Sequence, residues 1–117
     1  MISKKYRLSE REVKKVLRKW KPFFSYWIVL NSIRNNLDFN RFAIVIWWKS
    51  VVNSVSRNFF RRSFYNIVSS LTFSKNLWYD LVFVVKKTNK LDSTSIDAVF
   101  NFKKDILFLI KKITDER

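Results

Sequence analysis

The chain has 117 residues, of which 24 are Lys or Arg and 9 are Asp or Glu, so its formal charge at pH 7 is +15. This excess indicates an anionic partner, either nucleic acid or an anionic membrane surface, while a hydrophobic content of 48% suffices for one packed domain and excludes a disordered basic tail. Cys and His are absent, which excludes disulfides, thiolate nucleophiles, zinc sites built from these residues and the usual general base near neutral pH.

The first predicted element is a helix over Glu10–Trp20. Ser9 followed three residues later by Glu12 is a capping-box pattern, which is typical of a helix start. Apolar residues then recur at helical spacing, and Pro22 ends the helix.

Two strands follow in the prediction. Phe23–Ile33 is rich in aromatic and β-branched residues, which favours one strand or a pair of shorter ones. Arg34–Asn40 is the predicted turn, and Arg41–Trp48 is the next strand. Trp47 and Trp48, as neighbours on a strand, are expected to point to opposite faces.

A helix that ends near Leu71 is predicted next, with Ser54 or Ser56 as its cap. At about 100° per residue, one stripe is apolar and is expected to dock on the core. A second stripe is basic and polar. The apolar stripe contains Phe60, Phe64, Ile67 and Leu71, and the basic stripe contains Arg57, Asn58, Arg61, Arg62 and Tyr65.

The last elements are a strand over Leu77–Lys86 and a helix over Ser93–Ile113, separated by a turn at Lys87–Asp92. The strand is apolar at nearly every position, so we expect both of its faces to be covered. The buried side of the last helix is predicted to contain Ile96, Val99, Phe100, Ile106, Ile110 and Ile113.

These elements predict an α+β fold for residues 1–117, with no sign of a linker or a second domain. We expect a single-domain two-layer sandwich in which three helices pack on a small mixed sheet. The order is α-β-β-α-β-α, or α-β-β-β-α-β-α if the first strand is split.

The acidic residues are scattered, and no close pair stands in an apolar setting that would raise one pKa, so a self-contained active site is not expected. The longest apolar runs fall well below the ~18 residues of a membrane-spanning helix. The N-terminus lacks the apolar region of a secretory signal. We therefore expect a cytoplasmic protein.

The segment from Lys49 to Arg62 resembles the protein subunit of bacterial ribonuclease P. In that family a basic strand end is followed by Lys-Lys-x-Gly-Asn-Ala-Val-x-Arg-Asn-Arg-x-Lys-Arg, which opens a helix. Tyr79-Asp80-Leu81-Val82 is similar to a later Tyr-Asp-x-Val strand of the family, and Tyr6-Arg7-Leu8 is similar to its Arg-Leu start. The residues in register with the long motif are Lys49, Asn53, Val55, Arg57, Asn58, Arg61 and Arg62.

The chain departs from the family pattern at several positions. Phe59 takes the place of the second arginine of Arg-Asn-Arg, Ser50 that of the second lysine, and Val52 that of the glycine. These changes bear on how strongly this chain docks on RNA.

The resemblance implies an accessory subunit of a ribonucleoprotein endoribonuclease whose chemistry lies on the RNA. Its partners would be the catalytic RNA and precursor tRNA, with neither DNA nor a membrane, and it would be a monomer within the ribonucleoprotein. The protein itself would hold no cofactor, and magnesium would be bound through the RNA. The implied RNA-binding residues are Lys49, Asn53, Arg57, Asn58, Arg61, Arg62 and Tyr65, and a cleft for the 5′ leader of precursor tRNA would be lined by Val13, Leu17, Tyr26, Ile28 and Leu30.

Two alternatives remain open on the sequence. A divergent ribosomal protein or another RNA-binding module would show the same basic helix. A membrane-surface protein would use basic amphipathic helices, although asparagine among the arginines is more typical of docking on RNA. Phe59 either covers a sheet edge or stacks on RNA, and Tyr65 either stacks on a base or ribose or packs in the core.

Overall fold

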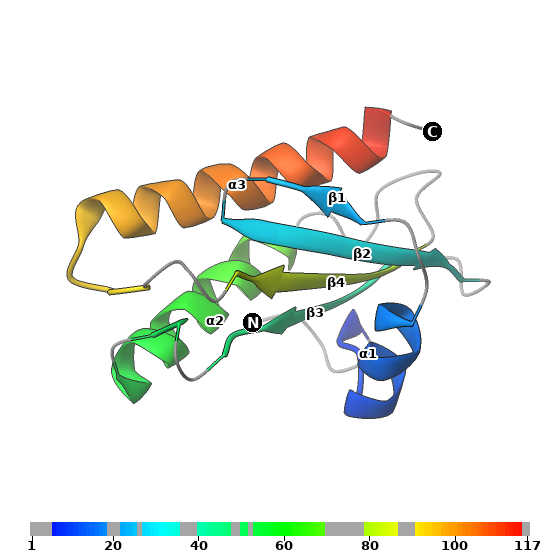
Figure 1. Cartoon of the computed structure of the whole chain (residues 1–117), viewed down its shortest axis with the longest axis horizontal. Helices are drawn as coiled ribbons and strands as arrows, with labels where there is room; N and C mark the ends of the chain where they lie inside the picture. The colour runs from blue at the N-terminus through cyan, green and yellow to red at the C-terminus, as the bar shows by residue number, and fades with distance from the viewer. Residues whose placement is uncertain are drawn as a thin grey trace.

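The structure is a computed structural model, which describes residues 6–18, 22–25, 27–35, 40–47, 50–51, 53–69, 79–86 and 91–115. Figure 1 shows the arrangement of its helices and strands. The elements in chain order are α1 (Glu10–Leu17), β1 (Phe23–Phe24), β2 (Ile28–Arg34), β3 (Arg41–Val45), α2 (Ser54–Ser69), β4 (Tyr79–Val85) and α3 (Ile96–Asp115).

The strands form one four-stranded sheet in the order β1-β2-β4-β3. β2 pairs with β1 and β4 antiparallel, whereas β3 and β4 are parallel and begin with Arg41 opposite Asp80. Parallel neighbours cannot be joined by a tight hairpin, so the chain crosses between β3 and β4 through α2.

Helices cover both faces of the sheet, with α2 and α3 on one face and α1 on the other (Figure 1). Alternation along the strands sends Leu30, Phe42 and Phe83 into the larger core beneath α2 and α3. The intervening residues Ala43 and Val82 meet Val16 of α1 in a smaller cluster.

The predicted α+β class, mixed sheet and element order are confirmed. Phe23–Ile33 is split into β1 and β2, the second form of that prediction. The predicted strand Arg41–Trp48 ends earlier, at Val45, and the helix predicted to reach Trp20 ends at Leu17. β4 is largely buried along its length, as expected for a strand covered on both faces.

The predicted cap of α1 is present. The Ser9 N–H donates to Glu12 Oε1 at 2.8 Å, and the Glu12 N–H donates to Ser9 Oγ at 3.3 Å. These two bonds satisfy backbone donors that the helix cannot pair internally, so they fix where α1 begins.

A polar network connects α1 to the two parallel strands. Arg41 donates from Nε to Asp80 Oδ1 at 2.8 Å and from Nη2 to Asp80 Oδ2 at 2.7 Å, and its Nη1 meets Glu12. Asn35 donates to Asp80 Oδ1 at 2.9 Å. Asp80 is 4% exposed, and its hydrogen bond raises the pKa of Arg41.

The prediction for α3 was wrong at Ile96 and Phe100, which are 86% and 62% exposed. Apolar residues lie almost all around this helix, so their spacing alone does not fix which side is buried. The buried side of α3 also carries Asp105, whose carboxylate accepts the Trp27 N–H at 2.6 Å. The buried residues are Ala98, Phe102, Ile106 and Leu109, Val99 and Ile110 are partly buried, and the side chain of Ile113 lies outside the described set.

Within the residues described, no helix is both long enough and apolar enough to cross a membrane.

We expect Arg41→Ala to lower the free energy of unfolding by about 3 kcal/mol, because it leaves the buried Asp80 carboxylate without its cation. Arg41→Lys should recover only part of this loss, since an ammonium cannot make the paired contact. Urea unfolding followed by circular dichroism measures both. Lys14→Ala, which removes an exposed pair with Glu10, is the control and should change little.

Glu12 makes part of this stability pH-dependent. Hydrogen bonds from Ser9 and the charge of Arg41 hold the pKa of Glu12 below its usual 4.5. A carboxyl with a lowered folded-state pKa stabilises the fold above its unfolded pKa, and that contribution disappears as the pH falls through the folded-state value. Wild type should therefore exceed Glu12→Gln in stability at pH 7, and the gap should close below about pH 4.5. Gln can keep the capping geometry, so the comparison isolates the charge of Glu12. A stability difference that does not change with pH would contradict the role given to that charge.

Candidate nucleic-acid interface

The N-terminus of α2 is capped by Asn53. Its Oδ1 accepts the Ser56 N–H at 2.8 Å, and its carbonyl accepts the Arg57 N–H at 3.1 Å. The prediction of Ser54 or Ser56 as the cap was therefore wrong, because both lie inside the first turn. Asn53 was expected to contact RNA, and in the structure its side-chain oxygen holds the helix start.

Arg57 ties the first turn of α2 to the end of β3. Its Nη1 donates to the Ile46 carbonyl at 2.8 Å, and the side chain is partly buried. The guanidinium has further donors, so Arg57 can serve the fold and also face an anion.

The loops beside α2 are joined to one another. The Leu91 N–H donates to the Ser50 carbonyl at 2.6 Å, and Ser56 Oγ accepts the Ser93 N–H at 3.1 Å. Ser50 is fully buried, with Oγ 3.4 Å from the Lys86 carbonyl. The residue at the family's second lysine position therefore belongs to the interior here.

Asn58, Arg61 and Arg62 form the exposed polar face of α2. The helix contains no acidic residue, and among the described residues no ion pair involves its arginines. Beneath them Phe60, Phe64 and Val68 are fully buried, which confirms the predicted apolar stripe as far as Ile67. Leu71, at the end of that stripe, lies outside the described residues.

The expectation that Tyr65 offers its ring to RNA was wrong. Tyr65 is 8% exposed, and its ring packs at 5.1 Å against Phe64. Burial raises the pKa of its hydroxyl, against the opposing charges of Arg61 and Arg7. Tyr65 lies at the margin of the arginine stripe, and its side chain packs in the core, which was the second of the two alternatives for this residue.

The residues predicted to line a cleft beside α1 lie on different faces of the sheet. Val13 packs on the smaller cluster and Leu17 is 42% exposed, so both lie on the α1 side of the sheet. Ile28 and Leu30 were assigned to the wrong face, since both are fully buried beneath α2 and α3. Side chains alternate along a strand, so a choice of face that is off by one residue moves the whole set.

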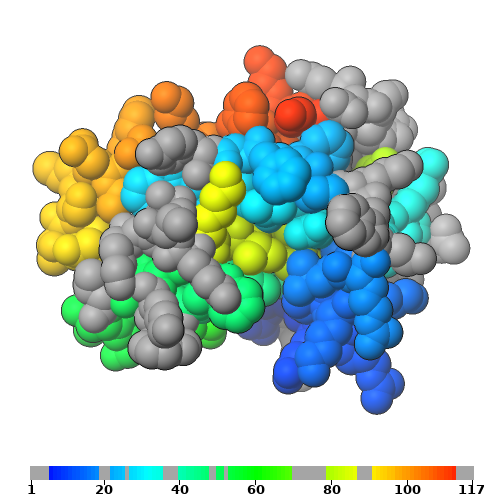
Figure 2. Space-filling view, viewed as in Figure 1, coloured from blue at the N-terminus to red at the C-terminus, as the bar shows by residue number. Residues whose placement is uncertain are grey.

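Val29, Asn31 and Ile33 are the β2 residues that share the face of α1, and none of them is fully buried. In the space-filling view, α1 (dark blue) leaves residues of β1 and β2 exposed beside it (Figure 2). Tyr26 and Lys49, the remaining predicted site residues, lie outside the described part of the chain.

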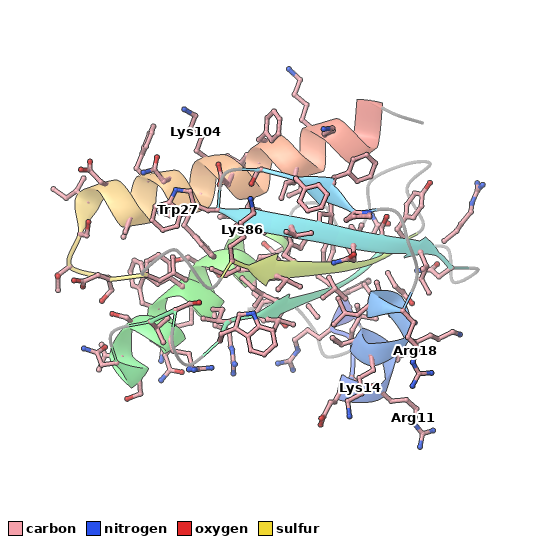
Figure 3. All side chains as sticks on the ribbon, in the orientation of Figure 1. Arg11, Lys14, Arg18, Trp27, Lys86 and Lys104 are labelled. Carbon is pink, nitrogen blue, oxygen red and sulfur yellow. The ribbon has the colours of Figure 1, made fainter. Side chains whose placement is uncertain are left out.

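Sequence reasoning missed cations around this open face. Lys86 donates from Nζ to the Ser25 carbonyl at 2.7 Å and lies 6.0 Å from the ring centre of Phe24, which is 58% exposed. Figure 3 shows Lys86 near Trp27. The alternation of β4 continued by one residue would have placed Lys86 on this face.

The outer side of α1 is also basic. Arg11, Lys14, Lys15 and Arg18 are exposed and line an open hollow of about 620 Å³ together with Glu10. In Figure 3, Arg11, Lys14 and Arg18 extend away from the sheet. Helical spacing of these cations in the sequence was a usable signal for a second basic surface.

Comparison with known families gives one family model that matches, Ribonuclease P, over residues 2–110. A comparison with curated proteins finds no match.

Similar folds occur among solved structures. The RNase P protein of Staphylococcus aureus is 18% identical, with a TM-score of 0.74 over 92% of this chain and 94% of that one. A mutant of that protein with defective mRNA degradation activity is also 18% identical, with a TM-score of 0.73 over 95% of this chain and 90% of the mutant. The RNase P protein of Thermotoga maritima is 21% identical, with a TM-score of 0.72 over 91% and 96%. At these identities the likeness establishes the fold.

Because Asn53 caps α2, Asn53→Ala should lower the free energy of unfolding by about 1 kcal/mol. Asn53→Ser keeps an acceptor at the cap and should retain most of the stability. Urea unfolding without RNA measures this difference. Equal stability of wild type and Asn53→Ala would show that the cap contributes nothing.

Proposed function

The chain belongs to the Ribonuclease P family, and on that premise we propose that it is the protein subunit of a ribonuclease P. It binds the catalytic RNA and the 5′ leader of precursor tRNA, and so assists 5′ maturation of tRNA. The observation that carries this proposal is the exposed face of α2, where Asn58, Arg61 and Arg62 stand on a helix without carboxylates.

This face suits folded RNA. The planar guanidinium groups of Arg61 and Arg62 can each donate two parallel hydrogen bonds to phosphate oxygens. Asn58 can donate to a phosphate and accept from a ribose hydroxyl. The N-terminus of α2 has no acidic residue in its first turn, so its helix dipole adds positive potential on the same side.

The open sheet face beside α1 suits a single strand. Phe24 and Val29 offer exposed or partly exposed apolar surface, Asn31 offers an amide, and Lys86 supplies a cation. Unpaired bases are bound by stacking on aromatic rings and by hydrogen bonds to their edges. We assign the 5′ leader to this face, bounded by Leu17 of α1.

In this proposal the RNA subunit carries out hydrolysis with magnesium ions that it holds itself. The protein supplies cations and a shaped surface on both sides of the sheet. Its part is to position the RNA and the substrate, which lowers the magnesium needed for cleavage.

Binding to the cognate ribonuclease P RNA should weaken steeply with salt, with log K falling by about 0.7–0.9 per phosphate neutralised for each unit of log salt. Arg61→Ala with Arg62→Ala should reduce that slope by about 1.5, as two phosphate contacts are lost. We exclude Arg57 from this pair because its substitution would also release α2 from Ile46. Filter binding across a salt series measures the slope.

Arg34→Ala with Lys111→Ala is the matched control, because it removes the same charge from exposed positions at the end of β2 and on α3. Its slope should change less than that of the arginine pair. Cleavage of precursor tRNA at low magnesium should need the wild-type chain. Preferential binding of ribosomal RNA, or reconstituted cleavage that is indifferent to the chain, would refute the proposal.

A further inference from the structure

Phe59 stands at the meeting point of two surface hollows. One, of about 410 Å³, lies between α2 and the start of α3, and the other, of about 500 Å³, lies along the outer side of α2. The first is lined by Phe59, Ser93, Thr94, Ile96, Val99, Phe100 and Lys103, and the second by Val55, Asn58, Phe59, Arg62, Ser63 and Asn66.

The Phe59 ring is held in place from below. It meets Phe60 edge-on at 5.3 Å between ring centres, and Phe60 meets Phe102 of α3 at 4.9 Å. Phe60 and Phe102 are fully buried, whereas Phe59 is 37% exposed. An aromatic group braced by the core in this way loses little freedom when a flat ligand stacks on it.

Phe100 provides a second aromatic group in the same hollow. It is 62% exposed, and Lys104 lies 6.0 Å from its ring centre. Figure 3 shows Lys104 on the outer side of α3. Phe100 and Ile96 lie on the side of α3 away from Asp105, so apolar surface at the start of α3 is uncovered.

The charges around these hollows are complementary to a polyanion. The residues that line them include Arg62 and Lys103 and no carboxylate. The nearby Asp92 carboxylate is engaged, since it accepts the Thr94 N–H at 3.0 Å and the Thr94 hydroxyl at 2.7 Å. Asn58 and Asn66 add amide groups able to read base edges.

We propose that Phe59 and Phe100 form a stacking site for unpaired RNA bases, which extends the α2 interface onto α3. The assignment rests on the proposed function and specifies its partner surface: a single-stranded segment of the bound RNA. Base-on-ring stacking supplies affinity and the flanking Arg62 and Lys103 hold the phosphates. Continuity with the exposed arginine face of α2 favours RNA over an apolar protein segment.

The test uses the full chain with two fluorescent probes, a decamer of riboadenylate and an abasic ribose-phosphate decamer of the same length. Phe59→Leu and Phe100→Leu keep apolar bulk but remove the flat ring. Phe108→Leu is the matched control, because Phe108 is 51% exposed on α3, has Lys112 at 6.0 Å from its ring centre, and lies outside the hollow. Thermal melts verify that each variant is folded.

Phe59→Leu and Phe100→Leu, the groove variants, should each bind the adenylate decamer about tenfold more weakly than wild type, and the Phe108→Leu control should bind it as tightly as wild type. The abasic probe should show no such difference, since it has no base to stack. With ribonuclease P RNA, the groove variants should lower affinity at every salt concentration while leaving the salt slope unchanged, because stacking releases no counterions.

Equal decamer affinity of the groove variants and the Phe108→Leu control would overturn the stacking site. A second result would also overturn it. If the wild-type chain dimerises with rising concentration, and Phe100→Leu abolishes the dimer but leaves RNA affinity unchanged, then the hollow between α2 and α3 binds a second copy of the chain. If Phe59 and Phe100 contribute to decamer binding but the chain shows no preference for ribonuclease P RNA, the stacking site is supported and the proposed function is refuted. If the affinity for ribonuclease P RNA falls steeply with salt but Phe59→Leu and Phe100→Leu have no effect on decamer binding, the proposed function is supported and the stacking site is refuted.

Discussion

The contact between Arg41 and Asp80 sets the geometry on which the rest of the fold depends. The two residues face each other at the first pair of the parallel β3–β4 ladder. A slip of one residue would break this contact and carry Phe42 out of the core. The register of β3 in turn sets the position of the Ile46 carbonyl, to which Arg57 attaches the first turn of α2. The direction of the exposed arginines is thus fixed from inside the sheet.

The sheet also separates two basic surfaces, one on α2 and one on α1. α2 and α3 cover one face, and α1 covers part of the other, so charge on α2 and charge on α1 cannot meet the same phosphate group. Glu12 and Asp80 both pair with Arg41, which stabilises the fold and neutralises the charge of one of the two carboxylates. Among the described residues, Asp80 and Asp105 are the buried acids and Glu12 is only partly buried, so few carboxylates offset the positive charge of the surface.

The sequence predicted the helices and strands better than it predicted which side of each one is buried. The capping box of α1 and the apolar stripe of α2 rest on local rules, and both are present in the structure. Ile28 and Leu30 were misplaced because β2 has apolar residues on both faces, so alternation gave no absolute direction. Ile96 and Phe100 were misplaced because apolar residues lie almost all around α3, and the side that is buried is the one that carries Asp105, which accepts the Trp27 backbone N–H. Asn53 and Arg57 were singled out by motif. The Asn53 cap is a local bond to Ser56, whereas the bond from Arg57 to the Ile46 carbonyl depends on how α2 packs beside the end of β3.

In the proposed stacking site, Phe59 would replace the charged contact of the family's arginine with a contact of a different kind. A guanidinium at this position would add a phosphate contact whose strength falls with salt. A braced phenyl ring offers a contact that salt hardly weakens, and it adjoins an apolar hollow that reaches α3. In the proposed complex, the Arg57, Arg61 and Arg62 side chains would supply the electrostatic part of the affinity from the same helix. Charge would then govern how RNA approaches α2, while the ring would govern which unpaired segment stays there, because stacking requires a base that is free to leave its own helix.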